Sequence, residues 1–96
     1  MNFMVRTFYP PYKAAEVGAL YNKSEARPHS VRTQGMFTRV DLKHGWETYT
    51  IYEVDEGKET EFNQWITRVL TPYAGIEGFN AQIDTVMKVG RPTSRG

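Results

Sequence analysis

The chain has 96 residues, of which 12 are Lys or Arg and 11 are Asp or Glu, and it contains no cysteine. The length predicts one domain, and the near-neutral charge argues against a protein built to bind nucleic acid phosphates or an anionic membrane surface. The lack of cysteine excludes disulfides and thiolate metal sites. No run approaches the ~20 apolar residues that span a bilayer, so we expect no membrane association and a cytoplasmic location.

The first predicted strand is Asn2–Tyr9, which is followed at once by two prolines. Both of its alternating faces are largely apolar, which is typical of a strand covered on both sides. Pro10 ends the strand, and Pro11 is well placed as the first residue of a helix. We therefore predict a helix from Pro11 to Glu25. Its buried side is predicted to hold Ala14, Val17, Leu20 and Tyr21.

The next two extended segments are predicted to form an antiparallel hairpin. Val31–Leu42 is a long segment in which Gly35 predicts a bulge or bend. Trp46–Val54 consists mostly of β-branched and aromatic residues, which favours a central strand. The turn Lys43–Gly45 is short enough to join the two strands directly.

The second helix has the clearest periodicity in the chain. Its apolar residues recur at the i, i+3, i+4, i+7, i+8 spacing of one helix face, at Phe62, Trp65, Ile66, Val69 and Leu70. Polar residues fill the opposite side, so the helix is predicted to lie on a sheet. Pro72 breaks the pattern, and Tyr73 is predicted to belong to a separate turn.

The last predicted strand is Phe79–Val89, where apolar and polar residues alternate sharply. This alternation fits an edge position better than a central one. Residues 91–96 contain no apolar anchor, so we predict a domain of residues 1–90 followed by a flexible tail.

The predicted order of strand, helix, strand, strand, helix, strand is that of the ferredoxin-like βαββαβ fold. This α+β fold has a four-stranded antiparallel sheet with both helices on one face. The other face is then bare. Since Met4, Phe8, Met36 and Val40 cannot all lie beneath two helices, the sheet face is predicted to be more apolar than a monomer usually exposes and to form a homodimer.

The opening segment Asn2–Pro11 and the strand Ile51–Val54 resemble the dimeric α/β-barrel superfamily, in which two such sheets pack face to face. The resemblance implies a small-molecule-binding protein or a cofactor-independent enzyme, monooxygenase-like or isomerase-like, and we expect an aromatic or polyketide-like ligand. Heme-degrading members place a histidine ligand on the second helix, where this chain has Trp65. No cofactor is therefore expected.

Arg6 is the most informative polar residue, because it lies in the middle of an apolar strand. A buried guanidinium needs a carboxylate partner or an anionic ligand. One reading is a cross-strand ion pair with Glu47, Glu53 or Asp84. The other reading is that Arg6 forms the floor of a pocket that binds a small acidic ligand through a carboxylate or enolate oxygen, and Arg6 is then a binding and catalytic candidate.

The two histidines, His29 and His44, both lie in predicted turns. Their spacing does not match a metal site, so no metal is expected. His44 is interpreted as a solvated turn residue. His29 lies close to Arg27 and Arg32 and is the second catalytic candidate, as an acid or base at a pocket mouth.

The ligand-binding candidates besides Arg6 are aromatic: Tyr12, Tyr49, Tyr52 and Trp65. They are predicted to ring a cavity between the helices and the sheet, with Tyr12 at the rim. Core packing alone is the competing interpretation for Trp65.

Two further functions stay open on the sequence. A structural or regulatory homodimer needs no ligand and no catalysis. RNA-recognition domains share the βαββαβ order, and His44–Ile51 begins like their third-strand octapeptide. Glutamate and threonine then stand where a small residue and an aromatic are needed, and Tyr49 and Tyr52 fall on opposite strand faces. RNA binding is therefore disfavoured.

Overall fold

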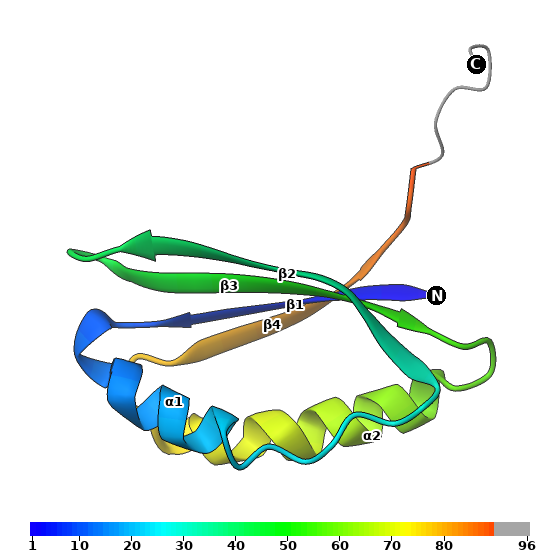
Figure 1. Cartoon of the computed structure of the whole chain (residues 1–96), viewed down its shortest axis with the longest axis horizontal. Helices are drawn as coiled ribbons and strands as arrows, with labels where there is room; N and C mark the ends of the chain where they lie inside the picture. The colour runs from blue at the N-terminus through cyan, green and yellow to red at the C-terminus, as the bar shows by residue number, and fades with distance from the viewer. Residues whose placement is uncertain (90–96) are drawn as a thin grey trace.

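The computed structural model describes residues 1–89, which form a four-stranded antiparallel sheet with two helices on one face (Figure 1). The predicted ferredoxin-like fold is confirmed. The strands are β1 (Asn2–Tyr9), β2 (Val31–Asp41), β3 (Gly45–Val54) and β4 (Asn80–Val86), and the helices are α1 (Ala14–Tyr21) and α2 (Glu59–Leu70). The predicted tail at 91–96 lies outside the described residues. Within residues 1–89, no helix is long and apolar enough to cross a bilayer.

The strand order is β2-β3-β1-β4, and each neighbouring pair is antiparallel. The predicted central position of β3 and the predicted edge position of β4 are both confirmed. β4 is shorter than predicted, because it ends at Val86, which pairs with Asn2 at the start of β1. Beyond Asn2 there is no neighbouring strand to extend the ladder.

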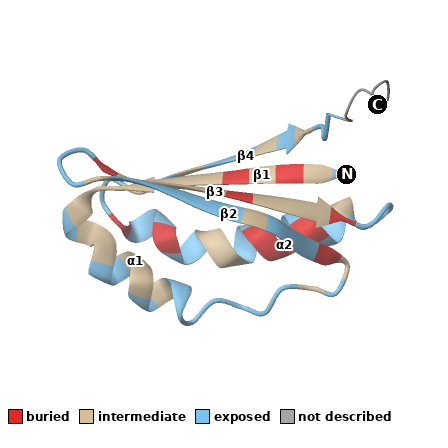
Figure 2. Ribbon diagram, turned by 45° about the horizontal axis from the view of Figure 1, so that its top comes forward, coloured by how far each residue is buried: buried red, intermediate tan, exposed pale blue. Residues whose placement is uncertain are grey.

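The main core lies between α2 and the sheet, as the red residues in Figure 2 show. Phe62 is fully buried, and its ring stacks on Phe3 with 4.6 Å between centroids. Tyr52 meets Trp65 edge-on at 5.5 Å. Burial of one such side chain contributes about 1.5–3 kcal/mol, so the predicted apolar face of α2 supplies much of the stability of the fold.

The first helix packs much more loosely than the second. None of the residues of α1 is buried, and Tyr21, predicted to be buried, is 59% exposed. The helix also ends at Tyr21 instead of continuing to Glu25. Glu25 is held by α2, because its carbonyl accepts a hydrogen bond from Trp65 at 3.3 Å and its carboxylate forms a two-pronged pair with Arg68 at 2.9 Å. These contacts hold Glu25 in the loop that follows α1.

The predicted bulge at Gly35 is confirmed, since the pairing of β2 with β3 shifts register between Thr33 and Gly35. A Cβ atom on Gly35 would lie only 2.9 Å from the Phe37 ring. The glycine therefore allows Phe37 to lie back over the strand. Beyond the bulge, the alternation of β2 side chains between the two faces of the sheet is shifted by one residue.

The sheet has a helix-covered face and an uncovered one, which we call the open face. Phe3 and Val5 are buried toward α2, so the alternate residues of β1 point the other way. Strand pairing carries this division across the sheet. The open face holds Met4, Arg6 and Phe8 of β1, Arg32, Phe37, Arg39 and Asp41 of β2, Glu47, Tyr49, Ile51 and Glu53 of β3, and Gln82, Asp84 and Val86 of β4.

The exposure of two valines at opposite ends of β2 shows where the core ends. Val31 is 1% exposed, whereas Val40 is 52% exposed on the same side of the strand. Val31→Ala should lower the free energy of unfolding by about 1.5–3 kcal/mol, because it leaves a cavity against α2. Val40→Ala, the matched control, should lower it by less than about 1 kcal/mol. Urea unfolding at one fixed protein concentration measures both, and equal losses would contradict this description of the core.

Candidate functional site

The structure divides the predicted aromatic site between the two faces of the sheet. Tyr52 and Trp65 pack in the core beneath the sheet, and burial raises the pKa of Tyr52. Tyr12 lies in the short 3-10 turn Pro11–Lys13 and is 71% exposed. Tyr49 is on the open face. These four side chains do not come together around one cavity.

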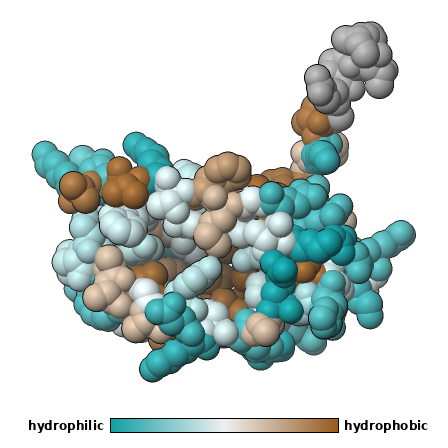
Figure 3. Space-filling model, viewed as in Figure 1, coloured by the Kyte–Doolittle hydropathy of each residue, from teal (hydrophilic) through white to brown (hydrophobic). Residues whose placement is uncertain are grey.

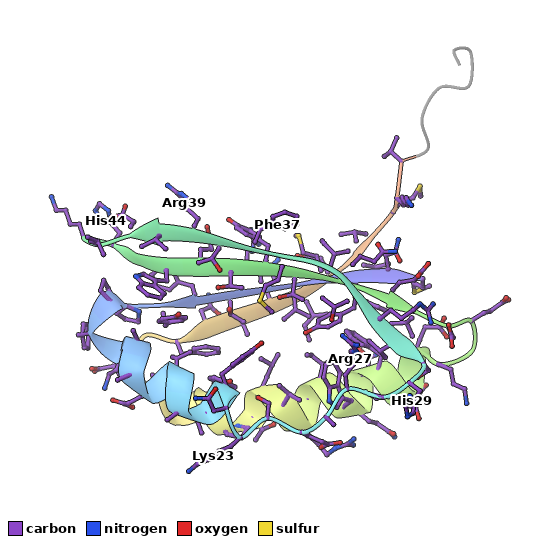
Figure 4. All side chains as sticks on the ribbon, viewed as in Figure 1. Lys23, Arg27, His29, Phe37, Arg39 and His44 are labelled. Atoms are coloured by element: carbon purple, nitrogen blue, oxygen red, sulfur yellow. The ribbon has the colours of Figure 1, made fainter. Side chains whose placement is uncertain are left out.

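The two catalytic candidates are also far apart. Arg6 is on the open face, directly opposite Tyr49 in the pairing of β1 with β3. His29 is exposed in the loop before β2. Figure 4 shows His29 near one end of the molecule and His44 near the other end, at the β2–β3 turn. Of the predicted site residues, the fold brings Tyr52 and Trp65 together in the core, and it brings Arg6 and Tyr49 together on the open face.

Arg6 has a neutral partner. It belongs to a row that crosses all four strands, with Phe37, Tyr49 and Gln82. Its guanidinium donates a hydrogen bond to the side-chain oxygen of Gln82 at 2.6 Å, and the amide nitrogen of Gln82 donates to Asp84 at 3.2 Å. Within residues 1–89, no carboxylate lies within salt-bridge distance of Arg6. The charge on Arg6 is therefore not neutralised by a direct partner in this part of the chain.

Tyr49 is held by a residue two positions earlier on its own strand, β3. Its hydroxyl donates a hydrogen bond to the carboxylate of Glu47. This hydrogen bond is the main reason that the pKa of Tyr49 is raised, while the nearby positive charge of Arg6 opposes the rise. Tyr49 thus stays protonated and presents its ring beside Arg6.

A hollow of about 210 Å³ lies next to this row, where the open face reaches the β2–β3 turn. It is lined by Phe8, Arg39, Asp41, His44, Gly45 and Glu47. Gly45 has a φ of +137°, and a Cβ atom there would lie 2.7 Å from both the Phe8 ring and the carbonyl of Tyr9. Glycine is therefore required for Phe8 to form the apolar floor of the hollow.

Asp41 and His44 form a hydrogen-bonded pair at this turn. One carboxylate oxygen of Asp41 accepts the backbone N–H groups of Lys43 and His44, at 2.9 and 3.1 Å, and the other lies 2.8 Å from Nδ1 of His44. These bonds, first of all that of the His44 ring, lower the pKa of Asp41 to about 2. His44 was interpreted from the sequence as a simply solvated residue. The aspartate three positions before it was the signal for this pairing.

A second hollow, of about 190 Å³, lies between the ends of α1 and α2. Leu20, Val69 and Tyr73 line it, and the Arg68–Glu25 ion pair forms part of its wall. Both hollows are smaller than the ~300–1,000 Å³ of typical drug-sized sites, so either one fits a small molecule only. Among the described residues, no group of three or more histidine, aspartate or glutamate side chains is placed to hold a metal ion.

Comparisons of the chain with protein-family models, with curated proteins and with solved structures find no significant match.

The lowered pKa of Asp41 gives a test of the turn. A folded-state pKa of about 2, below the ordinary value of 3.8, means that this carboxylate stabilises the fold above pH 4 and loses its contribution as the pH falls from about 4 to 2. An NMR titration should find the carboxyl carbon of Asp41 changing near pH 2. In His44→Ala the midpoint should rise toward the ordinary value. An unchanged midpoint in this variant would show that His44 is not the main cause.

Proposed function

We propose that this protein is a small-molecule-binding homodimer, in which two copies pack through their open faces and Arg6 holds the acid group of a small aromatic ligand. This assignment corresponds to the dimeric α/β-barrel arrangement that the sequence resembles. The observation that carries it is the neutral partner of Arg6. A positive charge at the centre of a partly apolar face is bonded to an amide instead of a carboxylate.

The composition of the open face supports its contact with a second copy. Met4, Phe8, Tyr49 and Ile51 lie there next to Phe37, which is 64% exposed. In Figure 3, hydrophobic and hydrophilic residues alternate along the upper margin, where the sheet is seen edge-on. Exposed apolar patches rimmed by polar residues mark sites of interaction with other proteins.

The two edges of the open face carry opposite charges, so the face of one copy can complement the face of a second copy. The open side of the β2 edge carries Arg32 and Arg39, and the open side of the β4 edge carries Asp84. A two-fold axis parallel to the strands can place β2 of one copy over β4 of the other, so that the basic edge of one copy lies over the edge that holds Asp84 in the second copy. Arg39 is 73% exposed, and its contact within the chain is a long one, 3.7 Å to Glu47.

The chemical class of the ligand is inferred from the effect of such packing on Arg6. A second copy over the open face removes water from the guanidinium, and an uncompensated charge in that position is costly. A carboxylate ligand supplies the missing charge in a two-pronged contact, and the rings of Tyr49 and Phe8 offer flat apolar surface to an aromatic group. This combination favours a small aromatic acid.

A homodimer without a ligand is the second candidate. Asp84 is favoured as the counter-charge in that case, because it already lies on the open face and reaches Arg6 through Gln82. RNA binding gains no support from the open face, because the carboxylates of Asp41, Glu47 and Glu53 lie among its aromatic residues.

The interface is tested with two neighbouring residues of β2. Phe37 lies on the open face and Met36 on the opposite face, and they are 64% and 50% exposed. Light scattering of the wild type at micromolar concentration should give twice the 11.1 kDa mass of one chain. Phe37→Lys should give a monomer, because it places a charge in the apolar contact, whereas Met36→Lys should remain a dimer. A dimer broken only by Met36→Lys would assign the interface to the other face.

The ligand site is tested by calorimetry with small aromatic carboxylates such as benzoate, salicylate and phenylpyruvate. For the acid that binds best, Arg6→Met should weaken binding by about 2 kcal/mol, or ~30-fold, because the charged contact is lost. Arg27→Met is the matched control, since Arg27 lies in the exposed loop before β2 and donates to Thr33. If none of the acids binds, the ligand proposal is wrong and the second candidate, a homodimer without a ligand, is favoured. An equal loss in both variants would exclude Arg6 as the specific site.

A further inference from the structure

The hollow at the β2–β3 turn contains a histidine whose ring is held in one tautomer. A carboxylate accepts hydrogen bonds but does not donate them, so the 2.8 Å contact with Asp41 places a proton on Nδ1 of His44. In the neutral ring the other nitrogen, Nε2, then carries the free lone pair. Asp41 is itself fixed by two backbone N–H groups of the turn. The pair is thus oriented before any substrate arrives.

The surroundings of this pair are those of a small binding site. The hollow has an apolar floor at Phe8 and a guanidinium at Arg39, which is 73% exposed and is free to take a second carboxylate besides Glu47. Figure 4 shows Arg39 and His44 on the same side of the sheet, near the turn. An anion-binding group, an aromatic surface and an oriented base therefore line one space of about 210 Å³, together with the carboxylates of Asp41 and Glu47.

We infer that this hollow is a proton-transfer site for aromatic 2-oxo acids, in which His44 interconverts their keto and enol forms. The inference goes beyond the proposed function, because it concerns the hollow at the β2–β3 turn and does not depend on Arg6, although both sites use the ring of Phe8. In a 2-oxo acid, the carboxylate suits Arg39 and the ring suits Phe8. The carbon between the ring and the oxo group carries the acidic hydrogen.

The reaction is balanced without an oxidant or a cofactor. Nε2 of His44 takes the proton from the carbon next to the oxo group, and the electrons of that C–H bond form a C=C bond while the C=O electrons move to oxygen. The guanidinium of Arg39 stabilises the negative oxygen. The imidazolium then gives its proton to that oxygen, which produces the enol, or returns it to carbon. Asp41 is a positioning residue that keeps Nδ1 protonated and stabilises the imidazolium.

Phenylpyruvate in D₂O tests the inference directly. The proton taken up by the imidazolium exchanges with D₂O, so deuterium is returned to the methylene carbon, and proton NMR measures this exchange against substrate concentration and gives kcat and KM. The wild type should exceed buffer alone, and His44→Gln should lower kcat at least tenfold. Asp41→Asn should also lower kcat at least tenfold with KM nearly unchanged, because an amide can keep the turn bonds but favours the tautomer with Nε2 protonated.

His29→Gln is the matched control, since it removes the other histidine of the chain from an exposed loop at the far end of the molecule and should leave exchange unchanged. A wild-type rate equal to that of buffer would overturn the inference, as would full exchange in folded His44→Gln. Amide NMR spectra of each variant establish that it is folded. The calorimetric test with Arg6→Met does not depend on the exchange rate. A negative result in the exchange experiment therefore does not decide the proposed function.

Discussion

Side chains along a strand must point alternately to two sides of the sheet, and in this protein a helix layer covers only one of them. Phe3 and Val5 are committed to the core beneath the sheet, where Phe62 packs on them. The intervening residues of β1, Arg6 among them, have no alternative to the open face. The position of the candidate site is thus a consequence of the core, because a shift of one residue in β1 would exchange the two sets.

The support of the sheet is uneven along its length. Near α2 the strands rest on a dense group of aromatic rings, whereas α1 contributes no buried side chain to the other half. The β2–β3 turn extends beyond this support, and it is held mainly by the hydrogen bonds that the backbone N–H groups of Lys43 and His44 donate to Asp41. The carboxylate that orients His44 therefore also stabilises the local structure in which His44 sits, and these two roles are separated only by substitutions that keep an acceptor.

Periodic signals in the sequence were sufficient for the architecture. The apolar spacing of α2 and the β-branched content of β3 predicted their type and place, and Gly35 marked the bulge. The end of α1 was missed, because Glu25 is held by Trp65, 40 positions later, and local sequence contains no sign of such a contact. The partner of Arg6 was missed for a similar reason, since the register of an edge strand decides whether an amide or a carboxylate lies opposite. For His44 the local signal was Asp41, three positions earlier in the same turn.

Gln82 separates two opposite charges on the open face. Its oxygen accepts a hydrogen bond from the guanidinium of Arg6, and its nitrogen donates one to the carboxylate of Asp84, so one neutral amide stands between a cation and an anion. Glutamine and glutamate codons differ by a single base. One nucleotide change therefore places a carboxylate at position 82, where it would be an internal counter-ion for Arg6 within the same strand pairing.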